Sequence, residues 1–314
     1  MDGEPGSPEF IASYATAEKS IRERAKGTIA DLIRRFEASP EFANMREGTT
    51  QKEYQRKFKV IDKKWGSAPI AAFNDKEFRV DALNWRDEVA IRARREADNL
   101  MSALARLGSW AFDRGEIERN VLDKIKRVYR SDRADKIWLP PHVAAFTRHA
   151  TPEMYTALML AMHTGQRQGD LLRLPWSAYD GKRIVLKQSK GGRLVSVRCT
   201  VALRTLLDGM VKRGPLILMT ASGRGWKKRY FNQRWTAVVE KAAITDLHFH
   251  DLRGTAVTML AEAGCTVPEI AAVTGHTLKH VTHILETYLA RTKSLADAAI
   301  VKLDRHTKRL QKRP

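Results

Sequence analysis

Apolar positions in the first third of the chain repeat with the spacing of amphipathic helices. Between residues 15 and 37 they fall largely on one helical face among charged residues. Over residues 54–65 they recur at spacings of four, three and four, and Thr50 precedes them as a candidate cap. Two shorter stripes follow before Gly115. We therefore expect a small helical domain over residues 15–115.

Two segments interrupt this periodicity. Residues 1–14 contain two Gly and two Pro within their first ten positions, and we expect an extended lead-in there. Residues 116–138 are densely charged and are followed by Pro140-Pro141. This composition is typical of a linker between two domains.

Beyond the linker, helical and β-type spacing alternate. Helical periodicity returns over residues 155–162. Two short β-rich runs, residues 183–186 and 194–197, flank Lys190-Gly191-Gly192 and predict a hairpin with a lysine at its turn. A further helix is expected over residues 278–289.

The length of 314 residues also favours two domains. We expect a mainly α fold with a small antiparallel β-sheet, of the α+β class, in which the second domain covers residues 139–292. The last segment, residues 293–314, combines apolar residues with many cations and is expected to form a tail or helix.

The charge of the chain indicates a polyanionic partner. The 56 Lys+Arg residues exceed the 36 Asp+Glu residues and leave a formal net charge of +20, with a pI near 10.1. Nucleic acid is the first partner to consider. A basic protein without such a partner is the alternative, because charge indicates attraction and no particular chemistry.

Several other classes of protein are poorly supported. Cys199 and Cys265 are the two cysteines, and neither has a Cys or His at zinc-ligand spacing, so we expect no structural metal and no disulfide framework. No apolar run reaches the length of about 18 residues that spans a bilayer, and no secretory leader is recognisable. We expect a cytoplasmic protein without a membrane partner.

Four short motifs carry the candidate chemistry. In chain order they are Thr164-Gly165-Gln166-Arg167-Gln168-Gly169-Asp170, Ser189-Lys190-Gly191-Gly192, His250-Asp251-Leu252-Arg253 and Thr274-Gly275-His276, with Tyr288 twelve residues after the last histidine. Each motif alone is a weak signal. Their order and spacing carry the inference.

This order resembles the catalytic domain of tyrosine recombinases, which presents Arg, Lys, His-x-x-Arg, His or Trp, and Tyr. The resemblance covers about residues 139–292 and, more loosely, the helical first domain, which is similar to the family's core-binding domain. The segment Pro5-Gly6-Ser7-Pro8-Glu9-Phe10 also resembles segments of prophage integrases. The resemblance implies six catalytic residues: Arg167, Lys190, His250, Arg253, His276 and Tyr288.

General chemistry supports these residue types. Breaking a phosphodiester without a metal requires a nucleophile, cations for the charge on the non-bridging oxygens, and an acid for the leaving oxygen. Arg167 and Arg253 have the planar guanidinium groups that bind phosphate in a bidentate manner. A free tyrosine has a pKa near 10, so Tyr288 needs those cations and a proton acceptor, for which His250 and His276 are the candidates.

The resemblance assigns the remaining roles. It implies that Tyr288 becomes joined to the 3′ phosphate and that Lys190 protonates the leaving 5′ oxygen. It further implies that His276 hydrogen-bonds the phosphate and that His250 assists as an acid–base group. Asp170, three residues after Arg167, is a candidate for orienting a catalytic side chain. Rejoining needs no ATP, and we expect no cofactor.

Each of these residues also has an ordinary interpretation. Tyr288 taken alone reads as a core tyrosine, because it shares a helical face with apolar residues. The arginines read singly as salt-bridged surface residues, Lys190 as a solvated turn lysine, and the histidines as hydrogen-bonded structural groups. We assign the four histidines outside the motifs to this structural class: His163, His248, His280 and His283.

Further DNA contacts are expected from basic faces of the first domain, for which a solvated surface is the alternative. The candidates are Arg22, Arg24, Lys26, Arg34, Arg35, Arg92, Arg94 and Arg95.

The resemblance implies an integrase of a phage or other mobile element that works on double-stranded attachment-site DNA. It implies a homotetramer on paired sites, with an accessory DNA-bending or excision protein as a further partner. The rivals are a dimer resolvase or a type IB topoisomerase of similar chemistry, and a DNA-binding regulator that keeps the fold without cleavage.

Overall fold

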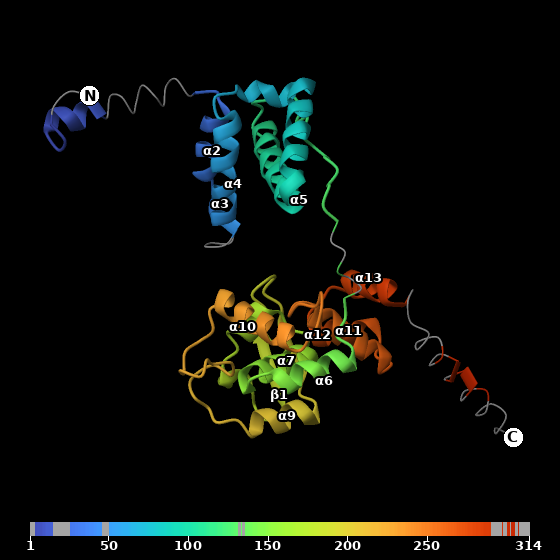
Figure 1. Ribbon diagram of the computed structural model, residues 1–314. Helices are drawn as coiled ribbons and strands as arrows, with labels where there is room; N and C mark the ends of the chain where they lie inside the picture. Colours follow the sequence, from blue (N-terminus) through green and yellow to red (C-terminus); the bar gives the residue numbers. More distant parts are fainter. Residues whose placement is uncertain are drawn as a thin grey trace. The chain divides into compact units, whose positions relative to one another are not determined.

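The protein divides into two compact units, Met1–Arg130 and Ser131–Pro314 (Figure 1). Only the backbone is described for residues 288 and 289. The computed structural model describes residues 4–14, 26–45, 50–130, 133, 136–289, 297, 300, 301, 303, 304 and 307.

The first unit is helical. Its elements are α2 (Ile29–Glu37), α3 (Pro40–Ala43), α4 (Thr50–Trp65), the 3-10 helix η1 (Ile70–Asn74) and α5 (Lys76–Phe112). The Thr28 hydroxyl accepts a hydrogen bond from the Asp31 amide and caps α2. In the core, the Phe36 ring meets Phe58 and Trp110 edge-on, with centroids 5.7 and 5.6 Å apart. The predicted helical character of this part of the chain is confirmed.

Two details of the first unit differ from the prediction. The two stripes before Gly115 belong to one helix, α5, which bends at Ala93 (φ −152°, ψ 75°), where neither Gly nor Pro marks the break. Residues 8–14 form a helix where an extended lead-in was expected, because the Ser7 hydroxyl accepts from the Phe10 amide. The predicted start of the first amphipathic helix, residues 15–25, lies outside the described residues.

The segment predicted as a linker is attached to the first unit as far as residue 129. Ile117 and Leu122 are buried in the core of the first unit. The Asp98 carboxylate accepts from the amides of Val128 and Tyr129 at 3.0 and 2.9 Å. The stretch that separates the two cores is therefore shorter than residues 116–138.

The second unit combines helices with one hairpin. Its helices are α6 (Pro140–His149), α7 (Pro152–Thr164), α8 (Gln168–Leu171), η2 (Trp176–Ala178), α9 (Val201–Asp208), α10 (Lys228–Lys241), α11 (Asp251–Glu262), α12 (Val267–Thr274) and α13 (Leu278–Leu289). Strands β1 (Arg183–Lys187) and β2 (Leu194–Arg198) pair antiparallel, with Val185 opposite Ser196. The mainly helical fold with a small antiparallel sheet is as predicted.

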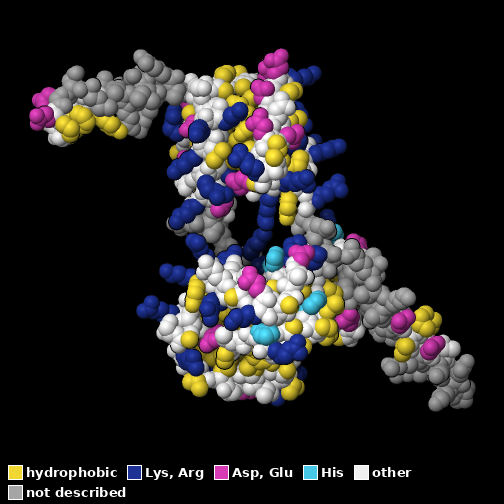
Figure 2. All heavy atoms as spheres, in the orientation of Figure 1, with side chains coloured by type: hydrophobic (Ala, Val, Ile, Leu, Met, Phe, Trp, Pro, Cys, Tyr) yellow, Lys and Arg dark blue, Asp and Glu magenta, His cyan; other side chains and the backbone are white. Residues whose placement is uncertain are grey.

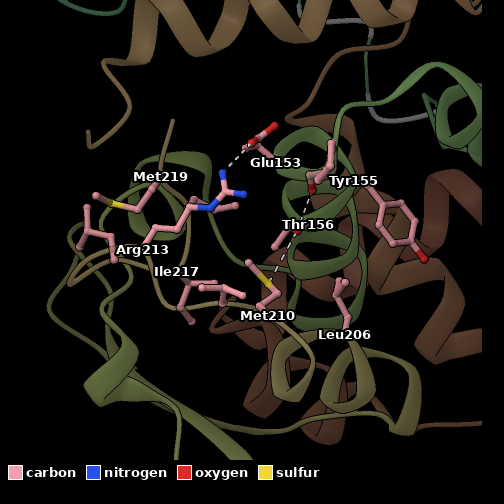
Figure 3. A pocket seen from close by; sticks show the side chains of 12 residues that line it. Glu153, Tyr155, Thr156, Leu206, Met210, Arg213, Ile217 and Met219 are labelled. Atoms are coloured by element: carbon pink, nitrogen blue, oxygen red, sulfur yellow. Dashed lines mark hydrogen bonds and ion pairs between the residues drawn. The ribbon is translucent and has the colours of Figure 1, made fainter. Parts of the chain in front are cut away.

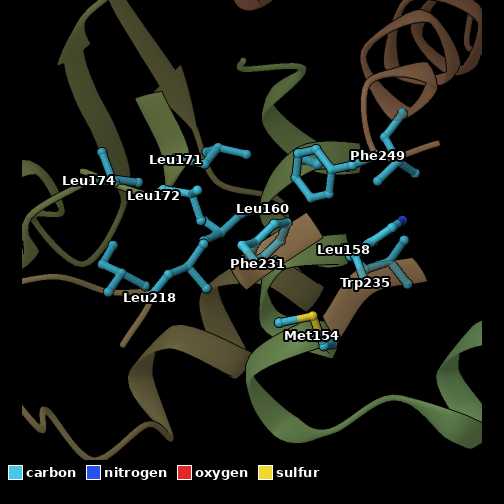
Figure 4. Packing of buried hydrophobic residues seen from close by; sticks show 14 of the residues in the cluster. Met154, Leu158, Leu160, Leu171, Leu172, Leu174, Leu218, Phe231, Trp235 and Phe249 are labelled. Atoms are coloured by element: carbon cyan, nitrogen blue, oxygen red, sulfur yellow. The ribbon is translucent and has the colours of Figure 1, made fainter. Parts of the chain in front are cut away.

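Helix α7 runs through the middle of this unit and packs against α11, α9 and α8. Its apolar residues lie in a core with aromatic side chains of α10 and of the segment before α11, among them Phe231, Trp235 and Phe249 (Figure 4). Trp235 meets Phe249 edge-on at 4.7 Å. This core fixes the C-terminal end of α7 and the start of α11, where the motif residues lie.

The start of α11 is held by a long-range ion pair. The Arg133 guanidinium donates to both carboxylate oxygens of Asp251, whose side chain is 4% exposed, and pairs with Asp246 at 2.8 Å. Asp251 also accepts from the His248 amide at 2.7 Å. The segment before α6 is therefore tied to the helix that carries His250 and Arg253.

We predict that Arg133→Ala destabilises the start of α11. The substitution leaves the buried Asp251 carboxylate with its backbone partner alone, at a cost of about 1–3 kcal/mol. Hydrogen–deuterium exchange of α11 should accelerate accordingly. Arg56→Ala is the control, because Arg56 is 62% exposed in its pairs with Glu53 and Glu96. Equal exchange in the two variants would contradict the assigned role of Arg133.

Candidate active site

Two helices of the second unit end in the same way. Thr164 closes α7 and Thr274 closes α12, and each hydroxyl donates back to the carbonyl four residues earlier, at 2.6 and 2.7 Å. Gly165 and Gly275 follow with φ of +63° and +70°, the left-handed conformation that glycine adopts without strain. A Cβ on Gly275 would lie 2.3 Å from Gln188 Nε2, so close approach requires glycine as well.

Arg253 joins these two helix ends. It extends from α11, is 5% exposed, and its Nη1 donates to the carbonyl oxygens of Gly165 and Thr274, the latter at 2.7 Å. Helix C-termini carry partial negative charge and stabilise a buried cation. Burial, together with the nearby Arg167, lowers the pKa of Arg253 to about 9, so that the side chain is still charged at neutral pH.

The second nitrogen of this guanidinium is free. Arg253 Nη2 is buried and has no hydrogen-bond partner among the described residues. A buried donor without a partner costs free energy. A ligand that brings an acceptor would remove that cost.

Arg167 lies beside Arg253 at the start of α8. It is half-buried, and its Nη1 donates to Gln188 Oε1 at 2.9 Å. In the described part of the chain, neither arginine forms a salt bridge with a carboxylate. The buried Asp170 acts on Arg253 from beyond ion-pair distance, so the pair keeps a surplus of positive charge, which suits an oxyanion.

His276 has a defined tautomer. Its Nδ1 lies 2.9 Å from the Thr274 hydroxyl, whose single proton is already donated to the Ile270 carbonyl. His276 Nδ1 must therefore carry the proton and donate, which leaves a lone pair on Nε2. Burial and then the charge of Arg253 lower the pKa of His276 to about 3, so the ring is neutral and Nε2 is a proton acceptor.

His250 lies at the residue before α11 and keeps contact with solvent. Partial desolvation lowers its pKa below the usual range, and the charges of Arg253 and Arg167 act in the same direction. His280, which was assigned a structural role, has its ring 4.9 Å from that of His276 and also feels both arginines. It belongs to the surroundings of the site.

Asp170 positions the hairpin. Its buried Oδ1 accepts from the Ser189 amide at 3.0 Å, at the residue before Lys190. On the other side of the turn, Arg193 Nη1 donates to the His276 carbonyl at 2.7 Å. Lys190 is exposed between these two anchors, and no described hydrogen bond or ion pair joins it to the arginines.

Tyr288 falls in the last turn of α13, as predicted for its helix. Its side chain lies outside the described residues. Helix α13 packs on α11 and α12 through the buried Val281. The structure thus brings together Arg167, Arg253, His250 and His276, with Asp170 acting through the hairpin.

The motif analysis missed a buried pair of glutamines. Gln166 and Gln188 are each 1% exposed and hydrogen-bond to each other at 2.7 Å. A signal for Gln188 was available, because Ile184 and Leu186 are the inward positions of β1 and the alternation continues to residue 188.

The candidate DNA contacts of the first unit differ in availability. Arg35 is engaged by Glu116 at 2.8 and 2.6 Å and by Asp31, which favours a structural role. Arg34 pairs with Asp31 at 3.2 Å, and Arg95 lies 5.9 Å over the Tyr129 ring. Arg34 and Arg95 are nevertheless exposed, as are Lys26, Arg92 and Arg94, for which the described structure shows no ion pair or ring contact. Arg22 and Arg24 lie outside the described residues. Lys and Arg side chains project from the visible faces of both units (Figure 2).

An apolar pocket of about 240 Å³ lies elsewhere in the second unit, between α7, α9 and the segment after α9 (Figure 3). An ion pair of 3.9 Å between Arg213 and Glu153 stands at its edge. None of the candidate catalytic residues lines it.

Two further findings concern the described residues alone. They contain no group of three or more His, Cys, Asp or Glu side chains arranged to hold a metal ion. Among them no helix is both long and apolar enough to cross a membrane.

Comparison with known proteins shows which family the second unit resembles. Residues 143–294 match the model of the phage integrase family. The chain is 33% identical over 151 residues to a shufflon-specific DNA recombinase of Escherichia coli and 28% identical over 155 residues to the integrase of Salmonella phage P22. These matches cover 45% and 44% of this chain, but only 38% and 40% of those relatives.

The fold has solved counterparts. A lambda integrase fragment, in a dimer bound to a core site, superposes with a TM-score of 0.68 at 18% identity, over 82% of this chain and 95% of that one. The integrase of transposon Tn1549, in complex with a circular intermediate DNA, gives 0.68 at 15% identity, over 88% and 100%. At these identities the likeness concerns the fold.

The region matched by the family model contains every motif residue, from Arg167 to Tyr288. Over residues 143–294, just under half of its length, the chain is therefore similar to the phage integrase family.

Proposed function

We propose that the protein is a site-specific tyrosine recombinase, an integrase of a phage or other mobile element, that cleaves and rejoins duplex DNA through a 3′-phosphotyrosine. The observation that carries the proposal is an arginine pair without an ion-paired carboxylate among the described residues, in which the buried Arg253 Nη2 lacks a partner. The pair lies in the region that matches the phage integrase family. A DNA phosphate supplies the missing acceptor.

The arginines bind the scissile phosphate and stabilise its transition state. Arg253 is fixed at two helix ends, so its free nitrogen needs no reorganisation when charge develops on a non-bridging oxygen. Arg167 approaches a second oxygen with the nitrogens that Gln188 does not occupy. Bidentate guanidinium contacts give the phosphate one orientation.

Proton transfer completes the reaction. Tyr288 attacks phosphorus, the tyrosyl ester forms, and the bond to the 5′ oxygen breaks. Burial and the charges of the two arginines lower the pKa of His276 in the free protein, and in the DNA complex the phosphate offsets those charges. The unprotonated Nε2 of His276 then takes up the tyrosine proton, and His250 assists. Lys190 protonates the 5′ oxygen as it leaves. The ester conserves the phosphodiester, so a 5′ hydroxyl reverses the step without ATP.

The partners follow from this chemistry and from the relatives. The net charge of +20 favours double-stranded DNA. A lambda integrase tetramer has been solved on a Holliday junction, which supports a homotetramer on paired attachment sites here. We further propose an accessory DNA-bending or excision protein, and action in the cytoplasm of a bacterial host. The 33% identity to a shufflon-specific DNA recombinase supports a second candidate function, which is site-specific recombination of a shufflon rather than integration of a phage or other mobile element.

The decisive test is a trapped covalent adduct. Wild-type protein incubated with nicked attachment-site DNA and then denatured should give a protein–DNA adduct on a gel. Tyr288→Phe should bind the DNA with nearly unchanged affinity and give none, since only the attacking oxygen is removed. Tyr230→Phe is the matched control, because Tyr230 is exposed and precedes His250. An adduct with Tyr288→Phe would refute the assignment of the nucleophile.

The acceptor role of His276 predicts its protonation behaviour in the DNA-free protein. A lowered pKa keeps the ring neutral at pH values where an ordinary histidine, with a pKa near 6.5, gains a proton. Ring nitrogen chemical shifts should therefore report a neutral Nδ1-H tautomer down to about pH 5. Thr274→Val is the control, because it removes the hydroxyl that accepts from His276 Nδ1. In this variant the ring nitrogen shifts should no longer report a single Nδ1-H tautomer. Titration near pH 6.5 would contradict the assignment.

DNA binding should weaken steeply with salt. Each neutralised phosphate contributes about −0.9 to the slope of log K against log salt concentration. Arg92→Ala and Arg94→Ala should each make that slope shallower by roughly one. Arg56→Ala, which removes an arginine already paired with Glu53 and Glu96, should leave it unchanged. Equal slopes in all four proteins would remove the two arginines from the DNA contacts.

A further inference from the structure

Gln166 and Gln188 are polar side chains in a place where apolar ones are the rule. Each is 1% exposed, and they connect three segments that are distant along the chain: the end of α7, the hairpin and the end of α12. Buried amides are tolerated when their hydrogen bonds are satisfied. The donor–acceptor direction of these bonds determines which atom of Gln188 faces Arg167.

The orientation of Gln166 is fixed by backbone acceptors. Its Nε2 donates to the carbonyl oxygens of Thr164 and Val273, at 2.9 and 3.0 Å. Carbonyl oxygens only accept, so both protons of this amide are used there. Gln166 Oε1 must therefore face Gln188 as an acceptor.

The orientation of Gln188 follows from that of Gln166. Its Nε2 donates to Gln166 Oε1 at 2.7 Å and to the Thr274 carbonyl at 3.0 Å, which uses both of its protons. Gln188 Oε1 can then only accept, and it receives Arg167 Nη1 at 2.9 Å. The two amides form a chain with one direction, which ends at the guanidinium.

The chain also connects Arg167 with the other parts of the site. The Thr274 carbonyl that receives Gln188 also receives Arg253 Nη1 at 2.7 Å. Gln188 stands two residues before Lys190 and directly before Ser189, which Asp170 holds. The Gln188 amide thus connects Arg167 and the carbonyl oxygen bound by Arg253 with the turn that carries Lys190.

A neutral acceptor suits this position better than a carboxylate. Arg167 and Arg253 feel each other's charge, and a cation held by a carboxylate would be largely neutralised before the phosphate arrives. An amide oxygen fixes one nitrogen of the guanidinium and leaves its full charge. The remaining nitrogens stay available to the ligand.

We propose that Gln188, held in one orientation by Gln166, is a positioning residue that aims the Arg167 guanidinium at the scissile phosphate without neutralising it. This inference rests on the proposed function and adds a requirement to it. Gln188 acts through Arg167 and takes no part in the chemistry itself.

The test is single-turnover cleavage of nicked DNA in complexes that are already formed. Gln188→Met, of similar size but without an acceptor, should lower the cleavage rate by about 10- to 100-fold, because a misplaced catalytic group loses that much. The DNA affinity should change by less than about threefold, because many other phosphate contacts determine it. Gln188→Glu should also slow cleavage, since it keeps an acceptor but neutralises Arg167.

Two further variants separate positioning from folding. Gln166→Met leaves Gln188 in place but unoriented, and should slow cleavage less than Gln188→Met does. If Gln188→Met has a markedly lower melting temperature than the wild-type protein, the cleavage rate of Gln166→Met is used as the test in its place. Gln168→Met is the matched control and should cleave at the wild-type rate, because Gln168 bonds to Asn232 outside the chain of amides.

A double-mutant cycle identifies the route of the effect. In an Arg167→Lys background, adding Gln188→Met should cost less than about threefold, because the guanidinium that Gln188 aims is gone. Cleavage at the wild-type rate by Gln188→Met, or an undiminished loss in the Arg167→Lys background, would overturn the positioning role while the proposed function stands.

A measurement that does not depend on cleavage tests the role of Gln188 even if the protein turns out not to be a recombinase. Inorganic phosphate should raise the melting temperature of the wild-type protein by binding the arginine pair. Gln188→Met should reduce that increase, and Gln168→Met should not. If wild-type protein forms no covalent adduct, the proposed function fails, but the phosphate measurement still decides the role of Gln188: an equal increase in both variants excludes it.

Discussion

The structure of the site depends on the burial of one guanidinium group. Arg253 is 5% exposed and has no carboxylate partner in the described part of the chain. A buried cation is expensive unless its surroundings compensate, and here the carbonyl oxygens at the ends of α7 and α12 do so. Both helices must therefore end at the same point, and Gly165 and Gly275 make that possible.

The sequence identified the groups at this point but not the way in which they are held. Arg167, His250, Arg253 and His276 stand in motifs whose order is informative, and the hairpin around Lys190 follows from local β-type spacing. Local patterns of this kind are readable because they reflect the period of a helix or strand. The mainly helical fold with its small sheet could be predicted on the same basis.

What escaped prediction depends on contacts between distant residues. The pair of Arg133 and Asp251 is separated by 118 positions, and that of Gln166 and Val273 by 107. No local pattern encodes such partners. The bend of α5 at Ala93 escaped for a different reason: the residues around it are good helix formers, so propensity favours continuing the helix there.

The charge of the free site also has an energetic consequence. Three features oppose stability in the absence of a ligand: the charge of Arg253, whose pKa is lowered by burial and by Arg167, its Nη2 donor without a partner in the described structure, and the neutral, buried His276. A phosphate relieves the first two conditions at once. The amide chain through Gln188 is compatible with both states, since its hydrogen bonds are satisfied with or without the ligand. The site can therefore remain rigid while its electrostatics change, which is the property that preorganised stabilisation of a transition state requires.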